Sequence, residues 1–195
     1  MKRFFDLFFS LVGFILLIPI FLLIAIAIKL DSKGPILFIQ SRVGQFGNDF
    51  DIYKFRTMQP KAYDKGLLTL GNDDPRITRV GRFLRHYKLD ELPQLANVIL
   101  GNMSLVGPRP EVRKYVDFYS KEDLQVLRVK PGITDYASIK FRHEAELLKH
   151  AKDPECTYLH HILPEKLKLN RQYIDENTLF LDFKLIFKTI LALFS

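Results

Sequence analysis

Two adjacent carboxylates, Asp90 and Glu91, stand in the segment KLDELPQL, directly after a basic stretch and just before a proline. As a helix N-cap, Asp90 needs no chemistry, because aspartate is a preferred residue at that position. As a reactive pair, the two suit phosphate chemistry, since an aspartate can attack phosphorus and carboxylates hold Mg²⁺ against phosphate oxygens. The cap interpretation leaves unexplained why Glu91 follows at once, so both interpretations stay open.

Before this pair, basic residues recur at every third position, at Arg76, Arg79, Arg82, Arg85 and Lys88. On an α-helix the middle three share an arc of about 120°, because each step of three residues falls about 60° short of a full turn. A solvated basic face is the ordinary interpretation, and a phosphate-binding surface is the alternative. A second helix is expected from Asp90, because Pro93 is tolerated in its first turn and Gly101 is placed to end it.

A rigid element follows in the segment SLVGPRPE, where Pro108 and Pro110 bracket Arg109. The two prolines restrict the backbone on both sides of the arginine. An arginine fixed in this way loses little entropy when it binds a phosphate, although a structural turn with a solvent-exposed arginine is equally compatible with the pattern. Upstream, β-rich runs around Gly44 and Gly47 predict a β-hairpin, with Lys54 and Arg56 on or beside it.

The N-terminal region carries eighteen uncharged residues, LVGFILLIPIFLLIAIAI, from residue 11 to residue 28, which is long enough for a membrane segment. Pro19, at the centre, removes a backbone donor and clashes with the carbonyl of Ile15, so a break is expected. Lysine and arginine flank the run on both sides, whereas a simple span should be asymmetric. We therefore favour a re-entrant hairpin that returns to its own face over a Pro-kinked span or a buried core helix.

The C-terminal segment LFLDFKLIFKTILALFS is apolar, with lysines four residues apart that share one helical face. It predicts either an interfacial helix with lysines at the headgroup level or a terminal helix packed on the core. The net charge of +7 favours an anionic partner, and nucleic acid fits this charge but not the apolar N-terminus. The single cysteine, Cys156, excludes an intrachain disulfide, and the sequence contains no zinc-binding or glycine-rich nucleotide motif.

The chain resembles the bacterial sugar transferases of the monotopic phosphoglycosyl transferase type, in their minimal catalytic form. The resemblance covers nearly the whole chain and rests on these segments: KRFFDLFFS, the apolar run broken at Pro19, KLDSKGPILFIQSRVG, YKFRTM, DPRITRVGRFLR, KLDELPQLANVILGNMSLVGPRPE, VKPGIT and LDFKLIFKTI. The long block from Arg76 to Pro110 makes a chance match very unusual.

This resemblance implies transfer of a sugar-1-phosphate from a UDP-sugar to a polyprenol phosphate such as undecaprenyl phosphate, with release of UMP. Asp90 would be the nucleophile that forms a phosphosugar-aspartate intermediate, and Glu91, together with Asp90, would hold Mg²⁺. The residues expected to bind phosphate or the uridine diphosphate are Arg85, Arg109 with its neighbours Pro108 and Pro110, and also Lys54, Arg56 and Arg128.

The resemblance also implies a mostly helical α+β fold with a small β-hairpin and interfacial amphipathic helices around an active site on the cytosolic face. Residues 1–30 would form the re-entrant membrane hairpin. Residues 31–195 would form a catalytic domain at the membrane interface, ending in an amphipathic helix over about 179–194. The expected location is the bacterial inner membrane, at the first membrane step of a glycoconjugate pathway, with no nucleic-acid partner and with a homodimer allowed.

Two departures from the family pattern bear on these expectations. The break reads Ile18-Pro19 where members often have Ser-Pro, so the hairpin depends more heavily on the proline. The segment PGITDYAS replaces the frequent PGITGWAQ, and we expect Asp135 and Tyr136 to bear on sugar recognition. The alternative function is a non-catalytic, membrane-anchored protein that binds anionic lipid or another polyanion, for which Asp90 would be dispensable.

Overall fold

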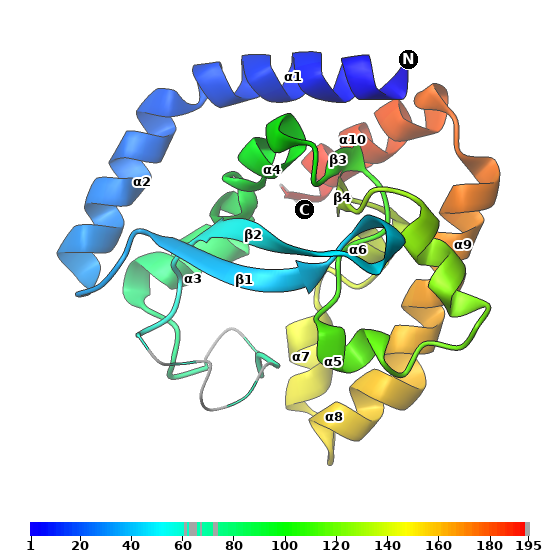
Figure 1. Ribbon diagram of the computed structural model, residues 1–195. Helices are drawn as coiled ribbons and strands as arrows, with labels where there is room; N and C mark the ends of the chain where they lie inside the picture. Colours follow the sequence, from blue (N-terminus) through cyan, green and yellow to red (C-terminus); the bar gives the residue numbers. More distant parts are fainter. Residues whose placement is uncertain (61, 63–65, 67, 72–73, 194–195) are drawn as a thin grey trace.

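The computed structural model describes residues 1–193 apart from residues 61, 63–65, 67 and 72–73. These residues form a mostly helical α+β fold with two small sheets, which confirms that part of the predicted fold class (Figure 1). The elements in chain order are α1 (Lys2–Leu16), α2 (Ile18–Asp31), β1 (Leu37–Val43), η1 (Gln45–Gly47), β2 (Asp49–Phe55), α3 (Arg79–His86), η3 (Leu89–Glu91), α4 (Gln94–Leu100), β3 (Ser104–Val106), α5 (Arg113–Val116), η4 (Asp123–Arg128), β4 (Gly132–Thr134), α6 (Tyr136–Lys140), α7 (Glu144–Lys149), α8 (Pro154–Thr157), η5 (Tyr158–Ile162), α9 (Leu163–Glu176) and α10 (Leu179–Leu193).

The N-terminal apolar run is broken where the sequence predicts. Helices α1 and α2 meet at Leu17 and are bent by 58°. Pro19 lies in the first turn of α2, where its missing N–H removes no bond from within that helix. Among the described residues no single helix is long and apolar enough to cross a membrane, whereas the bent pair together meets that test by length and composition.

Helix α1 has one polar face that packs against α4 and β3. Asp6 is buried there and accepts hydrogen bonds from Ser104 Oγ at 2.8 Å and from the backbone N–H of Leu105 at 3.1 Å. Arg3 donates to two carbonyls at the end of α4, where a cation complements the helix dipole. The opposite face of α1 exposes large apolar side chains, among them Phe4, Phe8, Leu11 and Ile15.

The predicted β-hairpin is confirmed. Strands β1 and β2 pair antiparallel, with Leu37 opposite Phe55 and Val43 opposite Asp49. Helix α4 is tied to this hairpin through the buried side chain of Asn97. Its amide oxygen accepts from the backbone N–H of Tyr53 at 3.0 Å, and its amide nitrogen donates to a backbone carbonyl of β2 at 2.7 Å. The segment that carries Asp90 and Glu91 is thereby held against β2.

The second sheet pairs β3 and β4 in parallel, with Ser104 opposite Gly132. The two strands approach so closely that a Cβ added at Gly132 would lie 2.1 Å from the backbone nitrogen of Gly107, so glycine is required there. Because the strands are parallel, their carboxyl ends lie together. Arg109 follows β3 and Asp135 follows β4, so this pairing brings the two residues to one edge.

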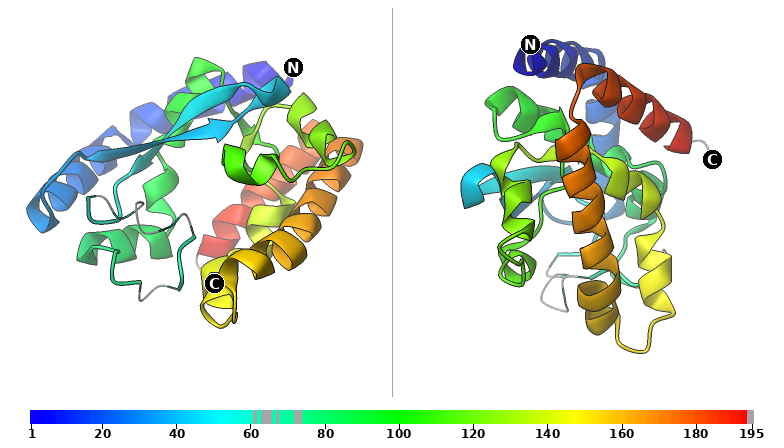
Figure 2. Two further views of the ribbon diagram at one scale, coloured as in Figure 1. Left: turned by 60° about the horizontal axis from the view of Figure 1, so that its bottom comes forward. Right: turned by 90° about the vertical axis from the view of Figure 1, so that its right-hand side faces the viewer.

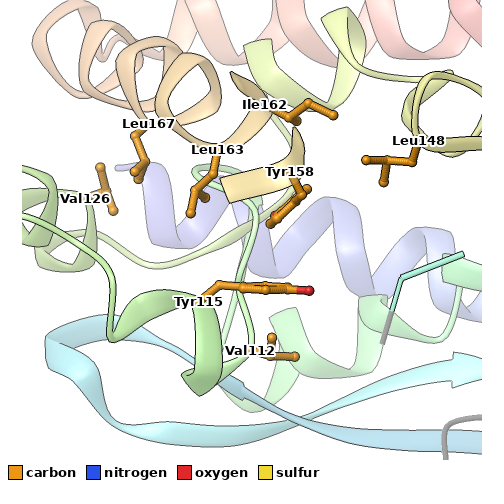
Figure 3. Close-up of a cluster of buried hydrophobic side chains, with 8 residues drawn as sticks. All are labelled: Val112, Tyr115, Val126, Leu148, Tyr158, Ile162, Leu163 and Leu167. Carbon is orange, nitrogen blue, oxygen red and sulfur yellow. The ribbon is translucent and has the colours of Figure 1, made fainter. Parts of the chain in front are cut away.

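The largest apolar cluster joins α5, η4, α7, η5 and α9 on the side of the molecule away from α1. Figure 3 shows its buried members, Val112, Tyr115, Val126, Leu148, Tyr158, Ile162, Leu163 and Leu167. The rings of Tyr115 and Tyr158 lie 4.7 Å apart between centroids. The cluster packs together the elements that follow Arg109 in the chain, from α5 to α9.

Helix α10 packs on the core, as one of its two predicted alternatives has it, and the interfacial placement stays a prediction. Leu181 and Leu185 are buried against the core, whereas the other side of the helix exposes Phe180, Phe183, Phe187, Ile190 and Leu191. The helix runs beside the N-terminal end of α1, where the rings of Phe5 and Phe183 lie 4.5 Å apart (Figure 2, right). The predicted helix over about 179–194 is confirmed to Leu193, and residue 194 lies outside the described residues.

Candidate active site

The backbone of Lys88, in a left-handed conformation, sets the position of Asp90 and Glu91. Helix α3 begins at the Thr78 cap, ends at His86 and is followed by Lys88, whose φ of 55° reverses the chain into η3. Asp90 and Glu91 then lie within the first turn of a helical segment that passes through Pro93 into α4. Asp90 is therefore not the N-cap residue of this segment, so the cap interpretation does not account for it.

Asp90 is buried, with an exposed fraction of 7%, and its Oδ1 has no hydrogen-bond partner among the described residues. Burial and then repulsion from Glu91 raise the pKa of this carboxyl, while the charges of Lys54 and Arg85 act in the opposite direction. A buried carboxylate oxygen without a donor is costly, so Asp90 is a candidate for contact with a bound ligand.

Glu91 lies in a contrasting environment. Its carboxylate accepts from Nη1 of Arg109 at 2.9 Å and from Nζ of Lys54 at 3.1 Å, and it also pairs with Nη2 of Arg109. Burial alone would raise its pKa, but Arg109 and Lys54 outweigh burial and hold the pKa well below the usual range. The two neighbouring carboxyls are thus pushed in opposite directions, a pattern that separates their chemical roles.

Lys54 reaches this pair from β2 and is itself largely buried. Burial lowers the pKa of its ammonium to about 8, attraction to Glu91 opposes the shift, and repulsion from Arg109 adds to it. The lysine therefore carries its charge at neutral pH but loses it in mildly alkaline solution.

Arg109 is held by its backbone as the two flanking prolines predict. The carbonyl of Pro108 accepts from the N–H of Gly132 at 3.0 Å, and the carbonyl of Pro110 accepts from Nη1 of Arg42 at 3.1 Å. Burial lowers the pKa of Arg109, but the contact with Glu91 outweighs it and the net pKa is raised. The two prolines also line a cavity of about 10 Å³, which is too small for a sugar.

The structure brings together Asp90, Glu91, Lys54, Arg85 and Arg109. Arg85 lies in the last turn of α3, and its charge opposes the rise in the pKa of Asp90. This set combines a partly exposed row of cations with one ionised and one unpartnered carboxylate. Such an arrangement can bind a polyphosphate and offer a nucleophile to it.

Two predicted binding residues lie elsewhere. Arg56 is buried and donates to the carbonyl of Pro35 at 2.6 Å and to the side chain and carbonyl of Ser32, so it fixes the loop after α2. Arg128 lines a separate groove of about 550 Å³ with Phe46, Arg113 and Leu124. The structure thus gives Arg56 a structural task and places Arg128 outside the carboxylate cluster.

Sequence reasoning missed two features that shape the site. Lys88 adopts a left-handed conformation that is uncommon for a residue with a side chain, and no local motif predicts it. Asp6 docks α1 on β3 through buried hydrogen bonds. Its position within an otherwise apolar helix could have indicated a buried polar contact, since an isolated carboxylate in such a helix needs a partner.

The protein can supply only some of the oxygen ligands that Mg²⁺ requires. Among the described residues no group of three or more acidic, histidine or cysteine side chains could hold a metal ion. Mg²⁺, however, is usually bound by one or two carboxylates together with phosphate oxygens and water. The unpartnered oxygen of Asp90 and the carboxylate of Glu91 fit that chemistry, provided that a bound phosphate draws Arg109 or Lys54 away from Glu91.

Fold and site together place a cluster of cations and carboxylates beside an apolar, kinked helix pair. The chain belongs to the family described as "Bacterial sugar transferase", whose profile matches residues 1–195. It is 38% identical over 192 residues to the UDP-N-acetylgalactosamine-undecaprenyl-phosphate N-acetylgalactosaminephosphotransferase of Aeromonas hydrophila, covering 97% of this chain and 42% of that protein.

Two further relatives extend this comparison. The UDP-glucose:undecaprenyl-phosphate glucose-1-phosphate transferase of Escherichia coli (strain K12) is 36% identical, over 97% of this chain and 39% of its own length. The uncharacterized sugar transferase EpsL of Bacillus subtilis (strain 168) is 35% identical over 97% of this chain and 85% of its own length. The chain therefore spans about two fifths of the first two relatives and most of the third.

Proposed function

We propose that this chain is a phosphoglycosyl transferase that moves a sugar-1-phosphate from a UDP-sugar to a polyprenol phosphate and releases UMP. The names of the relatives from Aeromonas hydrophila and Escherichia coli support the reaction class, because both include undecaprenyl phosphate and a UDP-sugar. The observation that carries the proposal is the buried, unpartnered carboxylate oxygen of Asp90 beside a cation-bound Glu91. The pathway would be a bacterial glycoconjugate pathway, at its first membrane step.

In the proposed reaction, an oxygen of Asp90 attacks the phosphorus that bears the sugar. The bond from that phosphorus to the bridging oxygen breaks, UMP leaves, and the sugar phosphate stays on Asp90. A phosphate oxygen of the polyprenol phosphate then attacks the same phosphorus and releases Asp90, which gives a polyprenyl diphosphate sugar. Lys54, Arg85 and Arg109 bind and orient the phosphates, and their charges favour the negative charge that accumulates during transfer.

Mg²⁺ is part of this proposal, held by Glu91 and Asp90. When bound, the ion would neutralise charge on the diphosphate of the donor. Arg109 and Lys54 are placed to exchange Glu91 for a phosphate, because both are charge-assisted donors with partly exposed side chains.

We further propose that residues 1–30 form a re-entrant hairpin and that residues 31–195 form the catalytic domain on the cytoplasmic face of the inner membrane. The break at Leu17, the basic flanks and the exposed apolar sides of α1 and α10 support this arrangement. Tags placed at residues 1 and 195 should report the same side of the membrane, as measured by labelling of intact and permeabilised cells. Tags on opposite sides would establish a span instead.

The reaction is tested by UMP release. Purified protein is incubated with Mg²⁺, undecaprenyl phosphate and a panel of UDP-sugars, in parallel with Asp90→Asn. We expect release with at least one donor and a loss of about 10³-fold or more in the variant, because the nucleophile is removed. Omitting the lipid acceptor should leave a sugar-phosphate adduct on Asp90, visible as a mass increase. Undiminished release from Asp90→Asn would overturn the assignment and favour a non-catalytic, polyanion-binding protein.

A further inference from the structure

Asp135 is a buried carboxylate that the proposed reaction does not use. Its exposed fraction is 0%, so its carboxylate has no free surface on which to meet a sugar. Both of its oxygens accept from the protein instead. Oδ1 accepts from the backbone N–H of Ser138 at 2.6 Å, which caps the start of α6, and Oδ2 accepts from the backbone N–H of Arg109 at 3.1 Å.

The contact between Asp135 and the backbone N–H of Arg109 follows from the sheet topology. Parallel pairing of β3 and β4 sets Arg109 and Asp135 side by side just beyond the carboxyl ends of the two strands. Asp135 is the hydrogen-bond partner of the Arg109 backbone N–H, and the guanidinium of the same arginine holds Glu91. The negative charge of Asp135 also acts on that guanidinium and favours its charged form.

We propose that Asp135 is a positioning residue for Arg109, which it fixes in the orientation that receives the diphosphate of the nucleotide sugar. Asp135 joins the start of α6 to the loop that carries Arg109, so the backbone of the arginine is fixed before the substrate arrives. Such preorganisation reduces the conformational entropy that is lost on binding. It also keeps the bound phosphates in the geometry that the reaction needs. The proposal rests on the proposed function in taking UDP as the ligand of Arg109.

The contact can be separated from the helix cap by choice of variant. Serine is a good N-cap, so Asp135→Ser keeps an acceptor for Ser138, but its shorter side chain loses the contact with Arg109. Asp153 provides a matched control, because it caps α8 in the same way, accepting from the N–H of Cys156 at 3.0 Å. Asp153→Ala thus removes a cap and leaves Arg109 untouched.

The experiment measures the dissociation constant for UDP with Mg²⁺ by titration calorimetry on the full chain in detergent, together with the melting temperature of each variant. Asp135→Ser should weaken UDP binding roughly tenfold, because one hydrogen bond to an ionised acceptor is lost at the residue that binds phosphate. Asp153→Ala should bind UDP like the wild type despite a lower melting temperature. If Asp135→Ser does not fold, Asp135→Asn takes its place, since it keeps one of the two acceptors.

A double-mutant cycle with Arg109→Ala provides the decisive comparison. We expect Asp135→Ser to cause no further loss of UDP affinity once Arg109 is truncated, because Asp135 affects UDP only through the guanidinium that the truncation removes. Unchanged affinity in Asp135→Ser, or a full additional loss in the Arg109→Ala background, would overturn the positioning role. Wild-type protein that binds no UDP would instead count against the proposed function.

Discussion

Two buried aspartates in this molecule are treated in opposite ways. Asp182 in α10 has an exposed fraction of 0%, pairs with Lys2 and accepts from the hydroxyl of Tyr173 at 2.7 Å. Asp90 is almost as deeply buried, yet its Oδ1 accepts from no donor. Burial of a carboxylate oxygen without a donor costs free energy, and a bound ligand can offset that cost. The comparison indicates that Asp182 fastens the two ends of the chain together and that Asp90 is reserved for a ligand.

The largest expected difference is between Asp182→Asn and Asp90→Asn, in both the free energy of unfolding and the rate of UMP release. Asp182→Asn should lower the free energy of unfolding by about 2 kcal/mol, because the buried hydrogen bonds that the carboxylate accepts from Lys2 and Tyr173 are both weakened. Asp90→Asn should leave the stability equal or higher, because it removes a desolvated charge, while it abolishes UMP release. Chemical denaturation of both variants beside the transfer assay checks this. Equal destabilisation by the two substitutions would contradict the distinction.

The raised pKa of Asp90 adds a pH test to the same comparison. The folded state keeps the proton to a higher pH than the unfolded chain, so the free energy of unfolding should fall as pH rises between the two pKa values. Asp90→Asn should remove this contribution, leaving a flatter profile of melting temperature against pH on the acid side. A profile identical to that of the wild type would mean that the carboxyl is not perturbed.

A smaller effect is expected at Glu91, which resembles Asp182 in being fully paired. Glu91→Gln should reduce UMP release by about 10²-fold and stability by only about 1 kcal/mol, because Arg109 and Lys54 are partly exposed and can turn toward water. Raising Mg²⁺ should restore part of the lost activity if Glu91 holds the ion. Activity that does not respond to Mg²⁺ would limit Glu91 to orienting Arg109.

The smallest effect concerns Lys54, the cation shared by both carboxylates. Its pKa of about 8 predicts that the affinity for UDP falls several-fold as pH rises through that value, because the ammonium is lost. Stability has the opposite sign, since the unfolded chain binds more protons between about 8 and 10.5, and so the free energy of unfolding rises there. Lys54→Arg should bind UDP with a flat profile. The same decline in that variant would assign the titration to another group.

Much of the local structure follows from neighbouring residues. The proline break in the apolar run, the hairpin around Gly44 and Gly47 and the glycine that ends α4 were predictable, because each depends on backbone preferences over a few positions. The charged residues near Asp90 could be named as candidates from their side-chain chemistry. Arg56 shows the limit of that reasoning, since its sequence context resembles that of Lys54, but its donors are taken up by backbone carbonyls after α2.

The sequence by itself determined a mostly helical α+β chain with a broken apolar N-terminus, a basic arc and a carboxylate pair. Only the tertiary structure decided which charges meet: Lys54 and Arg109 converge on Glu91 across separations of 37 and 18 residues, and Lys2 meets Asp182 across 180. Local preference is encoded by adjacent residues, whereas these pairings depend on how the strands and helices pack. That packing alone leaves Asp90 with a free oxygen and gives Asp182 two partners.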